Sequence, residues 1–176
     1  MKVQNKKTRI AVIILVIIDQ VIKIIINNNF LDKTFPILSS LLYFEPTFNR
    51  SYSWINSILQ LGIDKWIHIL AVVIMSILIY LFYQYLNKLF GTNKIINIMY
   101  AFIFSGAMCS LIDKIFWNGS LDYILLNGFF TFDLKDVYIS IFIGLLILSL
   151  FLKNKILNQI DNNLVKDFTK YILQKL

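Results

Sequence analysis

The sequence predicts an all-α integral membrane protein with four transmembrane helices and a small extracytoplasmic cap, made of a β-platform and a surface helix. Of the 176 residues, 58% are hydrophobic and only 15% are charged. Soluble domains are about half apolar and roughly a quarter charged. The mean hydropathy is +0.70. The apolar residues also fall into runs of the roughly 20 residues that cross about 30 Å of hydrocarbon. Lipid is therefore the expected solvent.

The apolar runs divide the chain into one four-span domain that covers residues 1–176. The predicted spans are residues 8–26, 66–86, 94–115 and 136–152. The cap is expected from residues 27–65 and 116–135, and a cytoplasmic amphipathic tail from residues 153–176. No repeat and no linker suggests a second domain.

The distribution of basic residues predicts the orientation. Eleven of the seventeen basic residues lie in three segments that four crossings place on one side. They are Lys2, Lys6, Lys7, Arg9, Lys88, Lys94, Lys153, Lys155, Lys166, Lys170 and Lys175. This asymmetry indicates that both termini are cytoplasmic and that the active site is extracytoplasmic. No basic patch stands apart from the membrane flanks, which argues against nucleic-acid binding.

The first outer connection predicts local structure as well. Pro36 and Pro46 interrupt helices, and aromatic and β-branched residues alternate with polar ones. We expect short strands around residues 44–54, followed by an amphipathic helix near residues 55–61 on the membrane surface.

Acidic residues are the main candidates for chemistry, because carboxylates near a bilayer are costly and tend to be functional. Asp113, Asp122, Asp133 and Asp136 lie in one stretch bounded by the third and fourth spans, and two of them are close to the ends of those spans. Two carboxylates held together would share a proton, as an aspartic protease requires. Other roles stay open: a helix cap at Asp133 or Asp136, an ion pair between Asp113 and Lys114, or a calcium or magnesium site.

For the other polar residues in the apolar runs, structural roles are favoured over functional ones. Asp19 and Lys23 lie four residues apart on one helical face, which favours a buried ion pair over a proton relay. His68 is expected at the membrane interface, and Cys109 is expected to be a buried thiol. No Ser/His/Asp set is available, so nucleophilic protease chemistry is disfavoured.

Five segments together resemble the signature of signal peptidase II, the lipoprotein signal peptidase of bacteria. The Asp19-Gln20-Val21-Ile22-Lys23 segment resembles Asp-Gln-x-x-Lys, and Asn49-Arg50-Ser51-Tyr52-Ser53-Trp54 resembles Asn-x-Gly-Ala-Ala-Phe/Trp. The segment at residues 106–114 resembles Gly-Ala-x-Gly-Asn-x-x-Asp-Arg. Leu121-Asp122-Tyr123 is similar to Val-Asp-Phe, and the segment at residues 132–136 is similar to Phe-Asn-x-Ala-Asp. The order and spacing agree over almost the whole chain.

The resemblance implies a membrane aspartic endopeptidase that removes signal peptides from prolipoproteins, just before a cysteine that carries diacylglycerol. It implies Asp122 and Asp136 as the catalytic pair. The implied supporting or substrate-binding residues are Asp19, Lys23, Asn49, Asp113, Lys114, Ser110 and Asp133. No metal and no cofactor are expected. The expected partners are lipid-modified precursors and membrane lipid. A monomer in the bacterial cell membrane is expected.

The sequence departs from the family pattern close to the candidate site. Cys109-Ser110 replaces Gly-Asn, Lys114 replaces Arg, Asp133 replaces Asn, Lys135 replaces Ala, and Tyr52 and Ser53 replace a small pair. A divergent, non-catalytic relative that binds lipoprotein or lipopeptide segments in the same groove is therefore the alternative. A transporter is weaker, since only Asp19 and Lys23 are charged in the interior of the spans, away from their ends.

Overall fold

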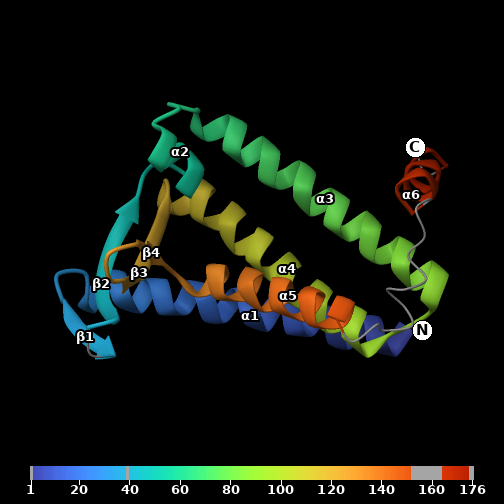
Figure 1. Cartoon of the computed structure of the whole chain (residues 1–176), viewed down its shortest axis with the longest axis horizontal. Helices are drawn as coiled ribbons and strands as arrows, with labels where there is room; N and C mark the ends of the chain where they lie inside the picture. The colour runs from blue at the N-terminus through green and yellow to red at the C-terminus, as the bar shows by residue number, and fades with distance from the viewer. Residues whose placement is uncertain (1, 39, 152–163, 175–176) are drawn as a thin grey trace.

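The structure, a computed structural model, describes residues 2–38, 40–151 and 164–174. Four long helices run along the molecule, and a small sheet closes one end of the bundle (Figure 1). They are α1 (Lys2–Asn29), α3 (Lys65–Phe90), α4 (Lys94–Ile112) and α5 (Leu134–Phe151). Helix α4 is central and packs against the other three.

The four helices are long and apolar enough to cross a membrane, which confirms the predicted fold class. The candidate spans are Lys6–Asn29, Lys65–Phe90, Lys94–Trp117 and Leu134–Phe151, with mean hydropathies from 1.9 to 2.5. Large apolar side chains face outward, as on α1, where Ile13 and Ile17 are more than half exposed. A helix satisfies its own backbone hydrogen bonds, so such a surface is stable in lipid but not in water.

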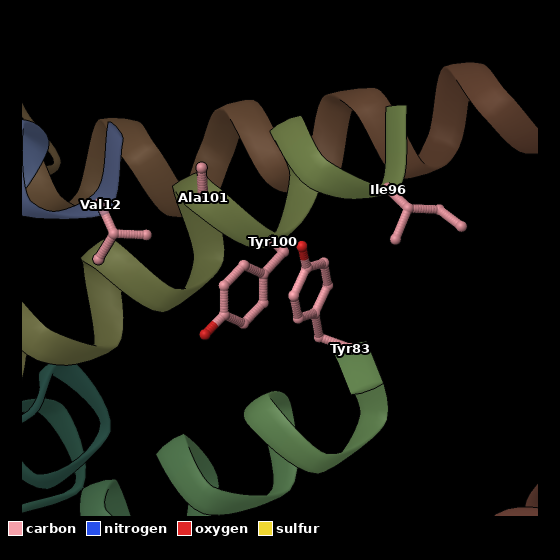
Figure 2. Packing of buried hydrophobic residues seen from close by; sticks show 5 residues of the cluster. All are labelled: Val12, Tyr83, Ile96, Tyr100 and Ala101. Atoms are coloured by element: carbon pink, nitrogen blue, oxygen red, sulfur yellow. The ribbon is translucent and has the colours of Figure 1, made fainter. Parts of the chain in front are cut away.

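The bundle core lies toward the end opposite the sheet. Tyr83 of α3 and Tyr100 of α4 stack with ring centroids 3.8 Å apart, beside Val12, Ile96 and Ala101 (Figure 2). The Tyr83 hydroxyl donates a hydrogen bond of 2.8 Å to Asn97 Oδ1. Each buried phenol that finds an acceptor avoids a desolvation penalty, so aromatic packing and polar satisfaction hold this end together.

The sheet has four antiparallel strands in the order β1-β2-β3-β4. They are β1 (Phe35–Leu38), β2 (Leu42–Asn49), β3 (Ser120–Leu126) and β4 (Phe130–Phe132). The expected strands around residues 44–54 are one strand, β2, which ends at Asn49. Residues beyond it turn into α2 (Trp54–Leu59), because Ser53 caps that helix by accepting a hydrogen bond from the backbone N–H of Asn56.

A single π-helical turn, η1 (Asp113–Trp117), joins α4 to the sheet. Such turns change the direction of side chains within a helix and are frequent at functional sites. Here the turn directs Asp113 into the interior, where its side chain is fully buried. Gly119 follows at φ +147° and approaches the carbonyl of Asn49 so closely that a Cβ atom would overlap it.

Only part of the predicted amphipathic tail is described. Residues 153–163 lie outside the described residues, and α6 (Leu164–Leu173) follows them. Phe168 of α6 packs edge-on against Phe82 of α3, with centroids 5.2 Å apart. The placement of this segment on the inner leaflet stays a prediction.

Candidate active site

The predicted site residues converge where the bundle meets the sheet. Helix α1 contributes Asp19 and Lys23, and η1 contributes Asp113. Strand β3 contributes Asp122, and the start of α5 contributes Asp133 and Asp136. Asn49 of β2 pairs with Ser120 of β3, two residues along the strand from Asp122. Residues more than 110 positions apart thus form one cluster.

Three carboxylates meet at the centre of this cluster. One oxygen each of Asp122, Asp133 and Asp136 lies within 4.8 Å of the other two. A single water molecule can hydrogen-bond to two oxygens at this separation, since each O–H···O bond spans about 2.7–2.8 Å. Asp122 and Asp136 are therefore close enough to act on one substrate.

Reciprocal capping holds Asp136 in place. The backbone N–H of Asp136 donates to Asp133 Oδ1 at 3.3 Å, and the backbone N–H of Asp133 donates to Asp136 Oδ2 at 3.2 Å. This is a capping box at the start of α5. The interpretation of these residues as helix caps is thus correct in geometry. It does not exclude catalysis, because one oxygen of Asp136 takes no part in the box.

Lys23 is the cation of a larger buried cluster than the sequence predicts. The expected pair with Asp19 exists at 3.2 Å. However, Lys23 Nζ is closer to Asp113, at 2.6 Å, and to Asp133, at 2.7 Å. All four side chains are fully buried. Asp113 pairs with Lys23 and not with Lys114, which donates instead to Ser110 Oγ at 2.8 Å. Lys23 therefore ties α1 to η1 and to the start of α5.

Gln20 completes this connection between α1 and η1. Its amide donates to Asp19 Oδ2 at 2.9 Å and to Asp113 Oδ1 at 3.2 Å, and its carbonyl oxygen accepts from Trp117 Nε1 at 3.0 Å. Asp19 Oδ1 is buried without a hydrogen-bond partner. The carboxylate of Asp19 is thus the least satisfied of those around Lys23.

Lys135 occupies a central position, whereas the sequence indicates it only as a departure from the family pattern beside Asp136 and not as a site residue. Its Nζ lies 2.5 Å from Asp133 and 3.5 Å from Asp122. It also lies 3.3 Å from Asp113 and donates to Ser120 Oγ at 2.6 Å. The signal was present, because Asp133 and Lys135 are two linked departures from the family pattern that add opposite charges. Ser120 was also missed; its two-residue spacing from Asp122 places both on one face of a strand.

The electrostatics of the site differ between neighbouring carboxyls. Burial raises the pKa of Asp122 above its ordinary value, and Lys135 offsets only part of that effect. Burial acts on Asp133 in the same sense, but the ammonium groups of Lys135 and Lys23 outweigh it and lower the pKa of Asp133 to about 2. Asp133 therefore stays ionised, whereas the raised pKa of Asp122 lets that carboxyl gain and lose a proton more readily, as an acid–base group must.

A cavity of about 490 Å³ opens onto these groups. Its lining includes Asp122 and Asp136, together with Asn49, Ser110 and Lys114. A second cavity of about 540 Å³ lies between the sheet and α2 and shares Asn49 and Asp122 with the first. Asp122 thus stands where the two cavities meet.

The remaining candidates lie near the site without entering the ion cluster. His68 is half-buried near the start of α3, with its ring 5.9 Å from that of Tyr52. Cys109 is fully buried. Among the described residues, Asp122, Asp133 and Asp136 are the set whose oxygens could share a metal ion. The ammonium group of Lys135 already supplies positive charge to two of them, and the absence of a metal from the reaction stays a prediction.

Fold and site together define a multi-pass membrane protein with a cluster of interacting carboxylates at one end of its helical bundle. The sequence profile of the family described as Signal peptidase (SPase) II matches residues 11–152. The chain belongs to this family.

Individual relatives agree with this assignment. The chain is 32% identical over 152 residues to the lipoprotein signal peptidase of Escherichia fergusonii, covering 82% of this chain and 88% of the relative. It is 30% identical over 138 residues to that of Fusobacterium nucleatum, covering 77% and 80%. The fold is similar to a bacterial membrane enzyme solved by the in meso method at 2.3 Å resolution. The TM-score is 0.62 at 22% identity, over 83% of this chain and 88% of that one.

Proposed function

We propose that this protein is an aspartic endopeptidase that removes signal peptides from lipoprotein precursors, with Asp122 and Asp136 as its catalytic pair. The observation that carries the proposal is their approach within 4.8 Å beside a cavity. Membership of the signal peptidase II family supports the same reaction.

The two carboxyls would act as one unit that shares a proton. One carboxylate accepts a proton from water as the water oxygen attacks the scissile carbonyl carbon. The other carboxyl donates its proton to the carbonyl oxygen, which gives a gem-diol. As the C–N bond breaks, the first carboxyl donates its proton to the leaving nitrogen, and the second carboxylate takes a proton from a gem-diol hydroxyl as the new carboxyl group of the product forms. Both catalytic carboxyls thereby return to their starting state.

The two cavities support an extended substrate that passes Asp122. The cavity that contains Asp136 includes Ile139 and Ser140 of α5, a helix expected to lie in the lipid. The other cavity lies between the sheet and α2 and includes Phe129. We propose that the signal peptide enters the first cavity from the membrane side and that the lipid-modified segment occupies the second cavity, between the sheet and α2.

The location follows from the charge asymmetry of the chain. We propose a monomer in the bacterial cell membrane with both termini in the cytoplasm and the site at the outer face. Lipid-modified precursors and membrane lipid would be its partners. The positive-inside distribution of lysine and arginine supports this orientation.

Conversion of each aspartate to asparagine tests the catalytic assignment. Asn keeps the shape of Asp but does not titrate. Asp122→Asn and Asp136→Asn should each lower the cleavage of a diacylglyceryl-modified precursor by roughly 10²–10⁴-fold, while the precursor still binds. Cleavage is followed on gels with purified protein in detergent. The matched control is Asp32→Asn, which removes an exposed carboxylate from the same face of the membrane.

Two outcomes would contradict the proposal in different ways. Cleavage that survives both substitutions would show that another group is catalytic. If the unmodified protein binds the precursor but never cleaves it, the non-catalytic binding role replaces the enzymatic one.

A further inference from the structure

We propose that Lys135, held by Asp133, is a positioning residue that directs the Ser120 hydroxyl toward Asp122 and controls the charge of the catalytic pair. This proposal rests on the proposed function, because it assumes that Asp122 and Asp136 act together. It assigns a role to two residues that depart from the family pattern.

The hydrogen bonds of Ser120 define a chain from Lys135 to Asp122. Lys135 Nζ donates to Ser120 Oγ at 2.6 Å. Ser120 Oγ lies 2.6 Å from Asp122 Oδ1, which is shorter than its distances of 3.2 Å to Asp113 and 3.3 Å to Asp133. A hydroxyl has one hydrogen to donate and can accept at the same time. The geometry therefore favours donation to Asp122 while Ser120 accepts from Lys135.

Lys135 also acts on Asp122 directly. The distance from its Nζ to Asp122 Oδ1 is 3.5 Å, and both side chains are more than nine-tenths buried. A charge at this distance and in this environment is weakly screened. The ionised form of Asp122 is thus favoured by a cation and by a donated hydrogen bond, both of which depend on Lys135.

Asp133 balances the charge of Lys135, which Asp113 at 3.3 Å and Ser120 at 2.6 Å also hold in place. Its carboxylate lies 2.5 Å from Lys135 Nζ and 2.7 Å from Lys23 Nζ, and it caps the first turn of α5. The pair Asp133 and Lys135 is neutral as a unit. The family pattern has Asn and Ala at these positions, which are also neutral together. The site therefore keeps its net charge only if both residues are present or both are replaced.

The charged groups around Asp122 are Lys135 and Asp136 of α5, Asp133 before α5 and Lys23 of α1. Asp113 of η1 is linked to Asp122 through Ser120, and Lys114 of η1 lines the same cavity. Replacing Lys135 alone and replacing Asp133 alone should change the pKa of Asp122 in opposite directions. Loss of the Lys135 cation raises the pKa of Asp122, whereas loss of the Asp133 anion lowers it. An opposite charge within a few ångströms changes a carboxyl pKa by about 1–3 units.

The test is a double-mutant cycle read from pH profiles of kcat/KM. The proteins are the unmodified chain, Asp133→Asn, Lys135→Met and the double variant, with Lys33→Met as a matched control that removes an exposed cation. The acid limb should move up by about 1–3 pH units in Lys135→Met and down in Asp133→Asn. It should return close to that of the unmodified protein in the double variant and stay in place in Lys33→Met.

A purely structural role would alter yield or kcat without moving the acid limb. Acid limbs that coincide in all the proteins, or singles that shift in the same direction, would overturn the proposal. If Lys135→Met does not accumulate as folded protein, Ser120→Ala takes its place, because it breaks the same chain and should also move the acid limb upward. Cleavage by Asp122→Asn would instead refute the proposed catalytic pair, and loss of all cleavage by the unmodified protein would refute the proposed function, so these failures are distinct.

Discussion

Replacement of Lys23 by methionine should destabilise the protein more than any single change among the carboxylates around it. Methionine has a similar length but no charge. The structure places Lys23 Nζ within 3.2 Å of Asp19, Asp113 and Asp133, and all of these side chains are fully buried. Removing one partner of a buried ion pair typically costs about 3–5 kcal/mol.

The contacts that remain without Lys23 favour the lower end of this range of destabilisation. Without Lys23, Asp133 keeps Lys135 at 2.5 Å and Asp113 keeps Lys135 at 3.3 Å. Asp19 has no other ion pair among the described residues. We therefore expect a loss near 3 kcal/mol, which corresponds to a melting temperature lower by roughly 6–12 °C for a chain of this size.

The double variant Asp19→Asn, Lys23→Met should recover part of this loss, because it removes the carboxylate that is left unpaired. Asp19→Asn alone should be the mildest of the three, at about 1 kcal/mol, since Lys23 keeps its two shorter contacts. The measurement can use Cys109, the single cysteine, which is fully buried. A dye that becomes fluorescent on reaction with a thiol then reports unfolding in detergent. A double variant that melts no higher than Lys23→Met would refute this reasoning.

Three further predictions concern topology, backbone and pH. A reporter fused after Lys153 should be active only in the cytoplasm and one inserted near Asn127 only outside; the reverse pattern would invert the proposed orientation. Gly119→Ala should destabilise the protein by about 1–3 kcal/mol and lower kcat/KM, because the added Cβ meets the carbonyl of Asn49. The control is Gly128→Ala, which has a positive φ but open space, and equal melting of the two would exclude a steric cause. Because burial raises the pKa of Asp122, the acid limb of kcat/KM in the unmodified enzyme should lie above the ordinary aspartate pKa of 3.8, and a limb below it would contradict that shift.

The sequence predicts the four spans and the main site residues because both depend on local patterns. Apolar runs reveal helices, and the i, i+4 spacing of Asp19 and Lys23 alone predicts their contact. The preference of Lys23 for Asp113 and Asp133 could not be predicted in the same way. It depends on how closely α4 and α5 approach α1, and helix packing is a tertiary property. The sequence indicates that charges are buried together but not which partner each one takes.

The same distinction explains Lys135 and the sheet. Lys135 follows Asp133 by two residues at a helix start, where side chains normally point in different directions. Its long, flexible side chain turns into the cluster, where its ammonium group donates a hydrogen bond to Ser120 of β3. The sequence does not show that β3 places Ser120 there. The pairing of β2 with β3 joins residues from 71 (Asn49 with Ser120) to 84 (Leu42 with Leu126) positions apart, and neither strand carries a hairpin signal that predicts it.

The position of Asp136 in the first turn of α5 has a consequence for how the membrane acts on the enzyme. Helix α5 packs mainly on α4, and its first turn carries Asp136. A thicker bilayer would draw α5 along its axis relative to the sheet that holds Asp122, at a fraction of a kcal/mol per ångström of mismatch. We therefore expect the separation of the two carboxyls, and with it turnover, to change with the length of the surrounding acyl chains.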